Sequence, residues 1–209
     1  MSQRPTTSAI VLAGGRGSRF GGDKLVADLA GRPVLERTID AVRPLVDEVL
    51  VVGRGGSTRG VAYLADDAAF QGPLAGLETG LRSAVGEVVV VLGGDMALAQ
   101  PAVLRLLADR VRIAVPGGPA AAVLVESGAV RPLPLALRRD GASDAAEAAL
   151  AEGGRSLRAL LDRLPVAVVD EATWRAVDPF GDTLIDVDTQ ADLSLARARL
   201  EADRLRARA

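Results

Sequence analysis

Short apolar runs alternate with amphipathic helical patterns through about the first 115 residues, and this alternation constrains the fold most strongly. Runs rich in Val, Ile and Leu predict buried strands, and apolar residues at helical spacing predict helices between them. The strands are expected at residues 8–13, 48–53, 87–92 and 112–115. The helices are expected at residues 33–45, 73–84 and 101–110. Strands joined by helices form right-handed βαβ units, so a mainly parallel sheet with helices on both faces is predicted.

The second half of the chain is less regular. Strands are expected at residues 120–125, 130–137, 165–169 and 183–187, and helices at 145–151 and 156–164. A last helix should begin near Thr189, because Thr189 to Asp192 resembles a capping box with Asp in place of Glu. No repeat or linker divides the chain. We therefore predict one α/β domain over residues 1–209, a doubly wound, Rossmann-like three-layer sandwich.

Neither cysteine nor histidine occurs among the 209 residues. Their absence excludes disulfides, Cys/His zinc sites, thiol nucleophiles and Ser-His-Asp triads. Catalysis would have to use carboxylates, Lys, Arg, backbone amides and a hard cation such as Mg²⁺. This set of groups suits phosphoryl and nucleotidyl transfer, in which positioning and charge neutralisation supply most of the rate.

The overall charge favours no macromolecular partner. A net charge of −2 and an isoelectric point of about 5.3 do not indicate nucleic-acid binding. Apolar runs such as residues 88–92 are much shorter than the roughly 18 residues that cross a bilayer. The first residues do not resemble a signal peptide, so we expect a cytoplasmic protein without membrane or nucleic-acid partners.

A glycine-rich loop with basic side chains follows the first predicted strand. It contains Gly14, Gly15, Arg16, Gly17, Arg19, Gly21, Gly22 and Lys24. Glycines let the backbone bend and bring amide N–H groups close to an anion, and Arg and Lys supply charge for a polyphosphate. The sequence therefore indicates a phosphate-binding loop, with a purely structural glycine loop as the alternative.

Two common phosphate-loop motifs do not fit this segment. A dinucleotide fingerprint that begins at Gly15 would place Phe20 where its last glycine belongs. A Walker A loop would need Lys immediately after Gly22 and a hydroxyl next, but Asp23 is inserted and Leu25 follows Lys24. The loop belongs to neither class.

The loop instead resembles the first signature of the nucleotidyltransferases related to molybdenum cofactor guanylyltransferase. The resemblance is carried by Leu12-Ala13-Gly14-Gly15, then Arg19-Phe20-Gly21 and Lys24. It implies a nucleotide site formed by Leu12, Ala13, Gly14, Gly15 and Arg16. It also implies that Arg19 and Lys24 bind the triphosphate and act in catalysis.

A second signature is matched by Gly72-Pro73-Leu74-Ala75-Gly76. In the family this segment begins a helix that faces the nucleotide, so Gly72 and Pro73 are expected to border it. An acidic residue typically stands five positions earlier, where this chain has Asp67, and Asp66 could substitute. The alternative is an ordinary helix that Pro73 initiates.

Asp95 follows the predicted strand at residues 87–92, and ligands of open α/β sheets bind beyond the carboxyl ends of strands. The resemblance implies that Asp95 is a catalytic Mg²⁺ ligand. The family usually has a proline two residues later, where this chain has Ala97, which should loosen the turn and keep the carboxylate. The alternative role for Asp95 is that of a turn residue or cap.

The segment Leu184 to Leu193 matches a terminal signature. Period two along the expected strand would place Asp186 and Asp188 on one face, where two carboxylates need a cation or a partner. They are therefore candidates for further Mg²⁺ ligands, and a solvated strand end is the alternative. Guanylyl-transferring members usually have asparagines here, and cytidylyl-transferring relatives more often have aspartates.

The resemblance spans Ile10 to Leu193 and implies transfer of GMP from GTP to molybdopterin, with release of pyrophosphate. Residues 8–115 would form the nucleotide-binding half and residues 116–209 the acceptor-binding half. CTP remains an alternative because Gly22 and Lys24 are one residue closer than usual and because Asp186 and Asp188 replace asparagines, whereas the segment from Gly72 to Gly76 favours GTP. Another phosphorylated acceptor, such as a sugar 1-phosphate, and a degenerate nucleotide-binding module also stay open. The sequence carries no signal for an oligomeric state.

Overall fold

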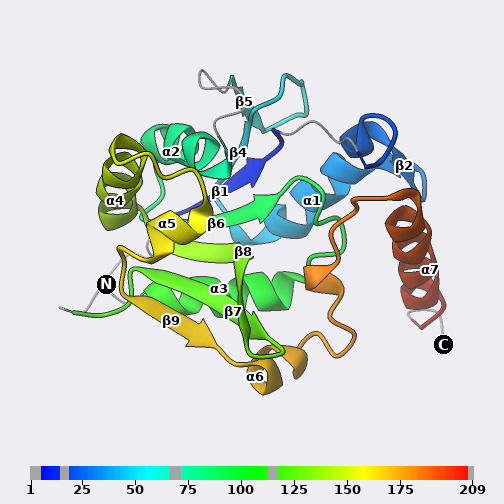
Figure 1. Ribbon diagram of the computed structural model, residues 1–209. Coiled ribbons are helices and arrows are strands. Elements are labelled where there is room, and N and C mark those ends of the chain that lie inside the picture. The colour runs from blue at the N-terminus through cyan, green and yellow to red at the C-terminus, as the bar shows by residue number, and fades with distance from the viewer. Residues whose placement is uncertain (1–5, 15–18, 66–71, 113–116, 207–209) are drawn as a thin grey trace.

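The computed structural model describes residues 6–14, 19–65, 72–112 and 117–206. It confirms the predicted α/β fold with a central, mostly parallel sheet (Figure 1). The strands of the sheet are β1 (Thr7–Leu12), β4 (Glu48–Val52), β5 (Ala62–Leu64), β6 (Val88–Gly93), β7 (Ala121–Glu126), β8 (Ala129–Arg138) and β9 (Val166–Val169). Their order is β5-β4-β1-β6-β8-β7-β9, and β8 runs antiparallel to both of its neighbours. A small hairpin pairs β2 (Asp28–Leu29) with β3 (Arg32–Pro33).

The helices are α1 (Val34–Val42), α2 (Pro73–Ser83), α3 (Pro101–Arg112), α4 (Arg139–Ala151), α5 (Leu157–Leu161), α6 (Glu171–Arg175) and α7 (Gln190–Arg206). Three single 3₁₀ turns are η1 (Lys24–Val26), η2 (Arg43–Leu45) and η3 (Asp182–Leu184). None of the described helices combines the length and the apolar character needed to cross a bilayer.

Each face of the sheet has its own layer of helices, as the doubly wound prediction requires (Figure 1). α2, α4 and α5 pack over one face, against side chains that include Ile10 and Val89. α1 and α3 pack over the other face, against side chains that include Ala9 and Val90. Neighbouring residues of a strand point to opposite faces, so a strand covered on both sides must be apolar throughout. This explains the unbroken apolar run at residues 88–92.

The chain order creates a switch point between β1 and β6. From β1 the chain passes through α1 to β4 on one side, and it later returns through α2 to β6 on the other side. Leu12 pairs with Gly93 at the carboxyl ends of these two strands, and Gly94 donates its N–H to the Leu12 carbonyl at 2.8 Å. The loop after β1 and the turn after β6 therefore meet at one place, which is where ligands bind in such sheets.

The expected strand at residues 183–187 is wrong. Asp182–Leu184 form η3, and residues 185–188 have no regular structure. The carboxylate of Asp178 accepts the backbone N–H of Asp182 at 3.0 Å and of Thr183 at 2.8 Å. These bonds wrap the backbone into a turn and occupy amides that a strand would offer to a neighbour.

Two further boundaries differ from expectation. The helix expected at residues 33–45 is divided into α1 and η2, because Pro44 has no N–H with which to continue the helical hydrogen bonds. The strand expected from Arg112 is wrong at that residue, which is the last of α3. The rest of that expected strand, residues 113–115, lies outside the described residues.

Candidate active site

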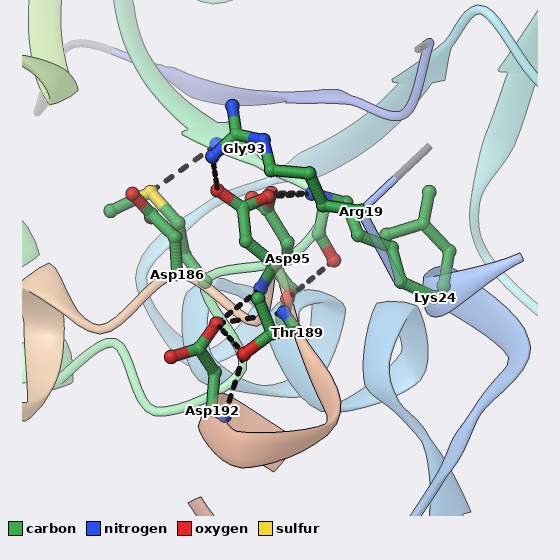
Figure 2. A network of polar contacts seen from close by, with 12 residues as sticks. Arg19, Lys24, Gly93, Asp95, Asp186, Thr189 and Asp192 are labelled. Carbon is green, nitrogen blue, oxygen red and sulfur yellow. Dashed lines mark hydrogen bonds and ion pairs between the residues drawn. The ribbon is translucent and has the colours of Figure 1, made fainter. Parts of the chain in front are cut away.

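Lys24 lies between two carboxylates at the switch point. Its Nζ donates to Oδ2 of Asp95 at 2.5 Å and to Oδ1 of Asp188 at 2.6 Å, and all three side chains are partly shielded from solvent (Figure 2). We call Lys24, Asp95 and Asp188 the Lys24 cluster. It joins the loop after β1, the turn after β6 and the segment before α7, which sequence signatures had selected separately.

The turn after β6 places Asp95 in the cluster. The N–H of Met96 donates to the carbonyl of Gly93 at 3.2 Å, and the Met96 side chain is buried beneath the turn. The hydroxyl of Thr38 donates to the carbonyl of Gly94 at 3.0 Å, which ties the turn to α1. These contacts hold the Asp95 carboxylate at the carboxyl edge of the sheet in a chain that has Ala97 in place of the family's proline.

The start of α7 places Asp188. Thr189 and Asp192 form the predicted capping box: the Asp192 carboxylate accepts the Thr189 N–H at 2.7 Å, and the Thr189 hydroxyl accepts the Asp192 N–H at 3.2 Å (Figure 2). The same carboxylate accepts the Asp188 N–H at 3.1 Å. One residue earlier, Val187 donates its N–H to the backbone carbonyl of Asp95 at 3.1 Å. The cap therefore fixes the backbone that carries Asp188.

Opposite charges keep Lys24 protonated. Burial lowers the pKa of Lys24, but hydrogen bonds to Asp188 and Asp95 outweigh that effect and raise the pKa above its ordinary value. Lys24 is therefore a cation at neutral pH. Asp186 has the reverse environment: burial, followed by the nearby Asp95 carboxylate, raises the pKa of Asp186 to about 6.

Arg19 and Asp186 lie at the margin of the Lys24 cluster. Nη1 of Arg19 is 3.7 Å from Oδ2 of Asp188, and the Arg19 side chain is 79% exposed, so it is free to move toward a ligand. Asp186 does not share a strand face with Asp188, which corrects the period-two prediction. Its Oδ2 lies 3.8 Å from Nη2 of Arg131. The two aspartates have different partners because the segment that carries them is irregular.

The other expected site residues divide into two groups. Leu12, Ala13 and Gly14 lie at the end of β1, where Ala13 donates its N–H to the carbonyl of Val52 at 2.8 Å. Gly72 caps α2 with a φ of 94°, and Pro73 is in its first turn, as predicted. A Cβ at Gly72 would lie 2.5 Å from the backbone carbonyl oxygen of Arg155, so the start of α2 packs closely against that residue. Gly15, Arg16, Asp66 and Asp67 lie outside the described residues.

Two functional candidates were missed by the sequence analysis. Asp23 caps η1 by accepting the N–H of Leu25 at 3.1 Å, and Arg54 binds both carboxylate oxygens of Asp23 at 3.0 and 2.6 Å. The available signal was a pair of opposite charges in two loops at the same edge of the sheet.

The oxygen donors of the cluster fit one kind of metal site. Among the residues that the structure describes, no group of three or more His, Cys, Asp or Glu side chains is arranged to hold a metal ion. Asp95 and Asp188 nevertheless converge on one cation, the ammonium group of Lys24. Mg²⁺ is usually held by one or two carboxylates together with substrate phosphates. The pair suits that arrangement and not an all-protein cage.

The sequence matches the family model of the MobA-like NTP transferase domain over residues 9–168. The chain belongs to the MobA-like NTP transferase family. A probable molybdenum cofactor guanylyltransferase of Chloroflexus aggregans is 31% identical over 199 residues, which cover 92% of this chain and 94% of the relative. A molybdenum cofactor guanylyltransferase of Pseudomonas putida is 38% identical over 166 residues, 77% of this chain and 84% of the relative.

A solved structure supports the same fold for this MobA-like chain. Molybdopterin-guanine dinucleotide biosynthesis protein A from Archaeoglobus fulgidus superposes with a TM-score of 0.79 at 24% identity. The match covers 93% of this chain and 99% of that protein. The family match and the fold together identify a nucleotidyltransferase of the MobA-like type.

Proposed function

We propose that this MobA-like protein transfers GMP from GTP to the phosphate of molybdopterin and releases pyrophosphate. The names of its relatives support this substrate pair. The observation that carries the proposal is the position of Lys24, which lies at the end of the glycine loop and between Asp95 and Asp188 at the switch point. A protonated lysine at this place suits the charge of a triphosphate.

The chain's own residues would act mainly by positioning and by charge. The acceptor phosphate is already an anion, so its attack on the α-phosphorus needs no protein base. This agrees with a sequence that has no His and no Cys. Lys24 and Arg19 would stabilise the negative charge that develops on the transferring group and on the departing pyrophosphate.

We further propose that Asp95 and Asp188 hold Mg²⁺ together with the nucleotide. When bound, the ion would supply positive charge that offsets the negative charge of the phosphates. The convergence of these two carboxylates on a single ammonium group supports the assignment. Asp186 is a weaker candidate, because its nearest described cation is the guanidinium of Arg131 at 3.8 Å.

CTP is the second candidate nucleotide. Asp186 and Asp188 stand where guanylyl-transferring members usually have asparagines, and the loop between Gly22 and Lys24 is one residue short. The names of the Chloroflexus and Pseudomonas relatives favour GTP over this alternative.

Pyrophosphate release tests these proposals. It is measured with GTP, CTP, ATP and UTP in turn, with and without molybdopterin, and with Mg²⁺ or excess EDTA. We expect release only when GTP, molybdopterin and Mg²⁺ are all present. Faster release from CTP would replace the guanylyl assignment. Binding of a nucleotide without release from any of the four would make the protein a nucleotide-binding module.

A further inference from the structure

The turn that follows β4 contacts the glycine loop at two separate points. Gly53 adopts a φ of 88°, and a Cβ at this position would lie 2.9 Å from the N and Cα atoms of Gly14. The next residue, Arg54, binds the carboxylate of Asp23 with two hydrogen bonds of 3.0 and 2.6 Å. Gly14 is the first glycine of the loop and Asp23 lies next to its last residue, Lys24, so Gly53 and Arg54 lie against the two ends of the loop.

Asp23 connects Arg54 to Lys24. Its Oδ1 atom accepts one bond from Arg54 and a second from the backbone N–H of Leu25, which caps η1. The hydrogen bond from Arg54 is the main cause that lowers the pKa of Asp23, so the carboxylate stays ionised at neutral pH. Lys24 stands between Asp23 and Leu25, and its backbone therefore moves with this cap.

The cap matters because η1 has little stability of its own. It is a 3₁₀ turn of three residues, and short turns of this kind depend on contacts outside themselves. The Nζ of Lys24 must nevertheless reach Asp95 and Asp188 at hydrogen-bond distance. A bidentate guanidinium–carboxylate pair fixes both distance and orientation, which a single lysine contact would not do.

We propose that Arg54 is a positioning residue for Lys24: through Asp23 it holds η1 so that the ammonium group stays between Asp95 and Asp188. The effect of Arg54 on catalysis rests on the proposed nucleotidyl transfer. The effect of Arg54 on the position of Lys24 does not depend on that proposal. The competing explanation is a surface ion pair that adds a little stability and leaves Lys24 unaffected.

A spectroscopic test reads the position of Lys24 without any substrate. Lys24 is the only lysine in the sequence, so selective ¹³C labelling of lysine gives a single set of side-chain NMR signals. We expect two distinct Cε proton shifts in the native protein, because the side chain is held. In Arg54→Ala they should collapse toward the averaged shift of a free lysine. Native-like signals in a folded Arg54→Ala would overturn the proposal.

A matched control removes an equivalent ion pair elsewhere. Arg163 binds Glu152 and the carbonyl of Ala159, far along the chain from the cluster, and its side chain is 29% exposed, compared with 25% for Arg54. Arg163→Ala should leave the lysine signals unchanged. Equal collapse in both variants would show a general loosening of the fold, which also overturns the proposal.

Steady-state kinetics provide a second test of the role of Arg54. Arg54→Ala should lower kcat/KM for nucleotide transfer roughly ten- to hundredfold, as misplacement of a catalytic group does. Arg54→Lys should recover only part of this loss, because a lysine ammonium group cannot form the bidentate pair that a guanidinium group forms with a carboxylate. In a Lys24→Ala background the same change should have no further effect, whereas a full additional loss would overturn the proposal. If the native protein transfers no nucleotide, the proposed function fails and the NMR comparison still decides the role of Arg54.

Discussion

Nζ of Lys24 lies 2.5 Å from Oδ2 of Asp95, although 71 positions separate the two residues in the sequence. The contact crosses the switch point between β1 and β6, where the carboxyl ends of the two strands are adjacent.

Replacement of Lys24 by Ala should remove the cation that we propose binds the triphosphate. We expect kcat/KM to fall by at least about two orders of magnitude, since one preorganised contact of this kind contributes roughly 3–4 kcal/mol to the transition state. Far-UV circular dichroism should show a native fold. Near-normal kcat/KM in the variant would remove the phosphate-binding role from Lys24.

Lys24 and a divalent cation should compete for the same two carboxylates. Because the ammonium group already binds Asp95 and Asp188, the native protein should bind Mn²⁺ weakly when no nucleotide is present. Lys24→Ala should bind it about tenfold more tightly, a change of ~1.4 kcal/mol. Calorimetry or the electron paramagnetic resonance of Mn²⁺ measures this directly. Equal or weaker binding by the variant would contradict the shared site.

Asp95→Asn should separate metal binding from folding. The Asp95 side chain is 20% exposed and does not belong to the core, so the thermal midpoint should stay within a few degrees of the native value. Mg²⁺-dependent transfer should be lost. Asp203→Asn, which breaks an ion pair with Arg206 on α7, serves as the control and should keep full activity. A large drop in the midpoint with activity preserved would instead make Asp95 a structural cap.

The cap of α7 predicts a pH-dependent stability. Hydrogen bonds from Thr189 lower the pKa of Asp192 below its ordinary value of 3.8. A lowered native pKa means that the carboxylate stabilises the fold above the unfolded pKa, and that this contribution is lost as pH falls through the native pKa. Asp192→Ala should cost about 1 kcal/mol at pH 7, a typical cap value, and less near pH 3, which lies below the ordinary pKa of 3.8.

Thermal unfolding of Asp192→Ala and of the native protein at the two pH values measures the difference. Ser194→Ala in the same helix is a suitable comparison, since its hydroxyl donates only to the carbonyl of Gln190. A gap between Asp192→Ala and the native protein that is the same at both pH values would show that the ionised carboxylate is not what stabilises the cap.

The base preference follows from hydrogen-bond matching. If Asp67 faces the base, its carboxylate can accept from the N1–H and the 2-amino group of guanine, whereas cytosine offers only its 4-amino group. One unpaired acceptor costs about 1–3 kcal/mol, so GTP should be preferred over CTP by at least roughly tenfold. Asp67→Asn should narrow that ratio. A preference for CTP, or a ratio that Asp67→Asn leaves unchanged, would favour the cytidylyl alternative.

The local pattern of apolar and polar residues correctly predicted those strands whose sequence is determined by burial alone. β1, β4 and β6 are apolar throughout because helices cover both faces, and the loop and turn that follow β1 and β6 could be placed from that alone. The prediction of a strand at residues 183–187 was wrong because apolar and polar side chains alternate there as they do in a strand. The Asp178 carboxylate accepts hydrogen bonds from the backbone N–H groups of Asp182 and Thr183. The alternation of apolar and polar residues does not indicate these bonds.

The sequence predicted which residues belong to the candidate site, but it did not predict the contacts among them. The signatures selected Lys24, Asp95 and Asp188, but the ion pairs among them depend on the order of strands in the sheet. The Asp23–Arg54 pair was missed for the same reason, since it joins two loops that only the pairing of β1 with β4 brings together.

The segment that carries Asp188 follows all the described strands of the sheet in the sequence. β9, the last strand, ends at Val169, and Asp188 meets Lys24 across 164 positions of sequence. A polypeptide emerging from the ribosome would thus contain all the strands that the structure describes before it contains the second carboxylate. The second carboxylate would therefore reach Lys24 only after the strands that support the site have been synthesised.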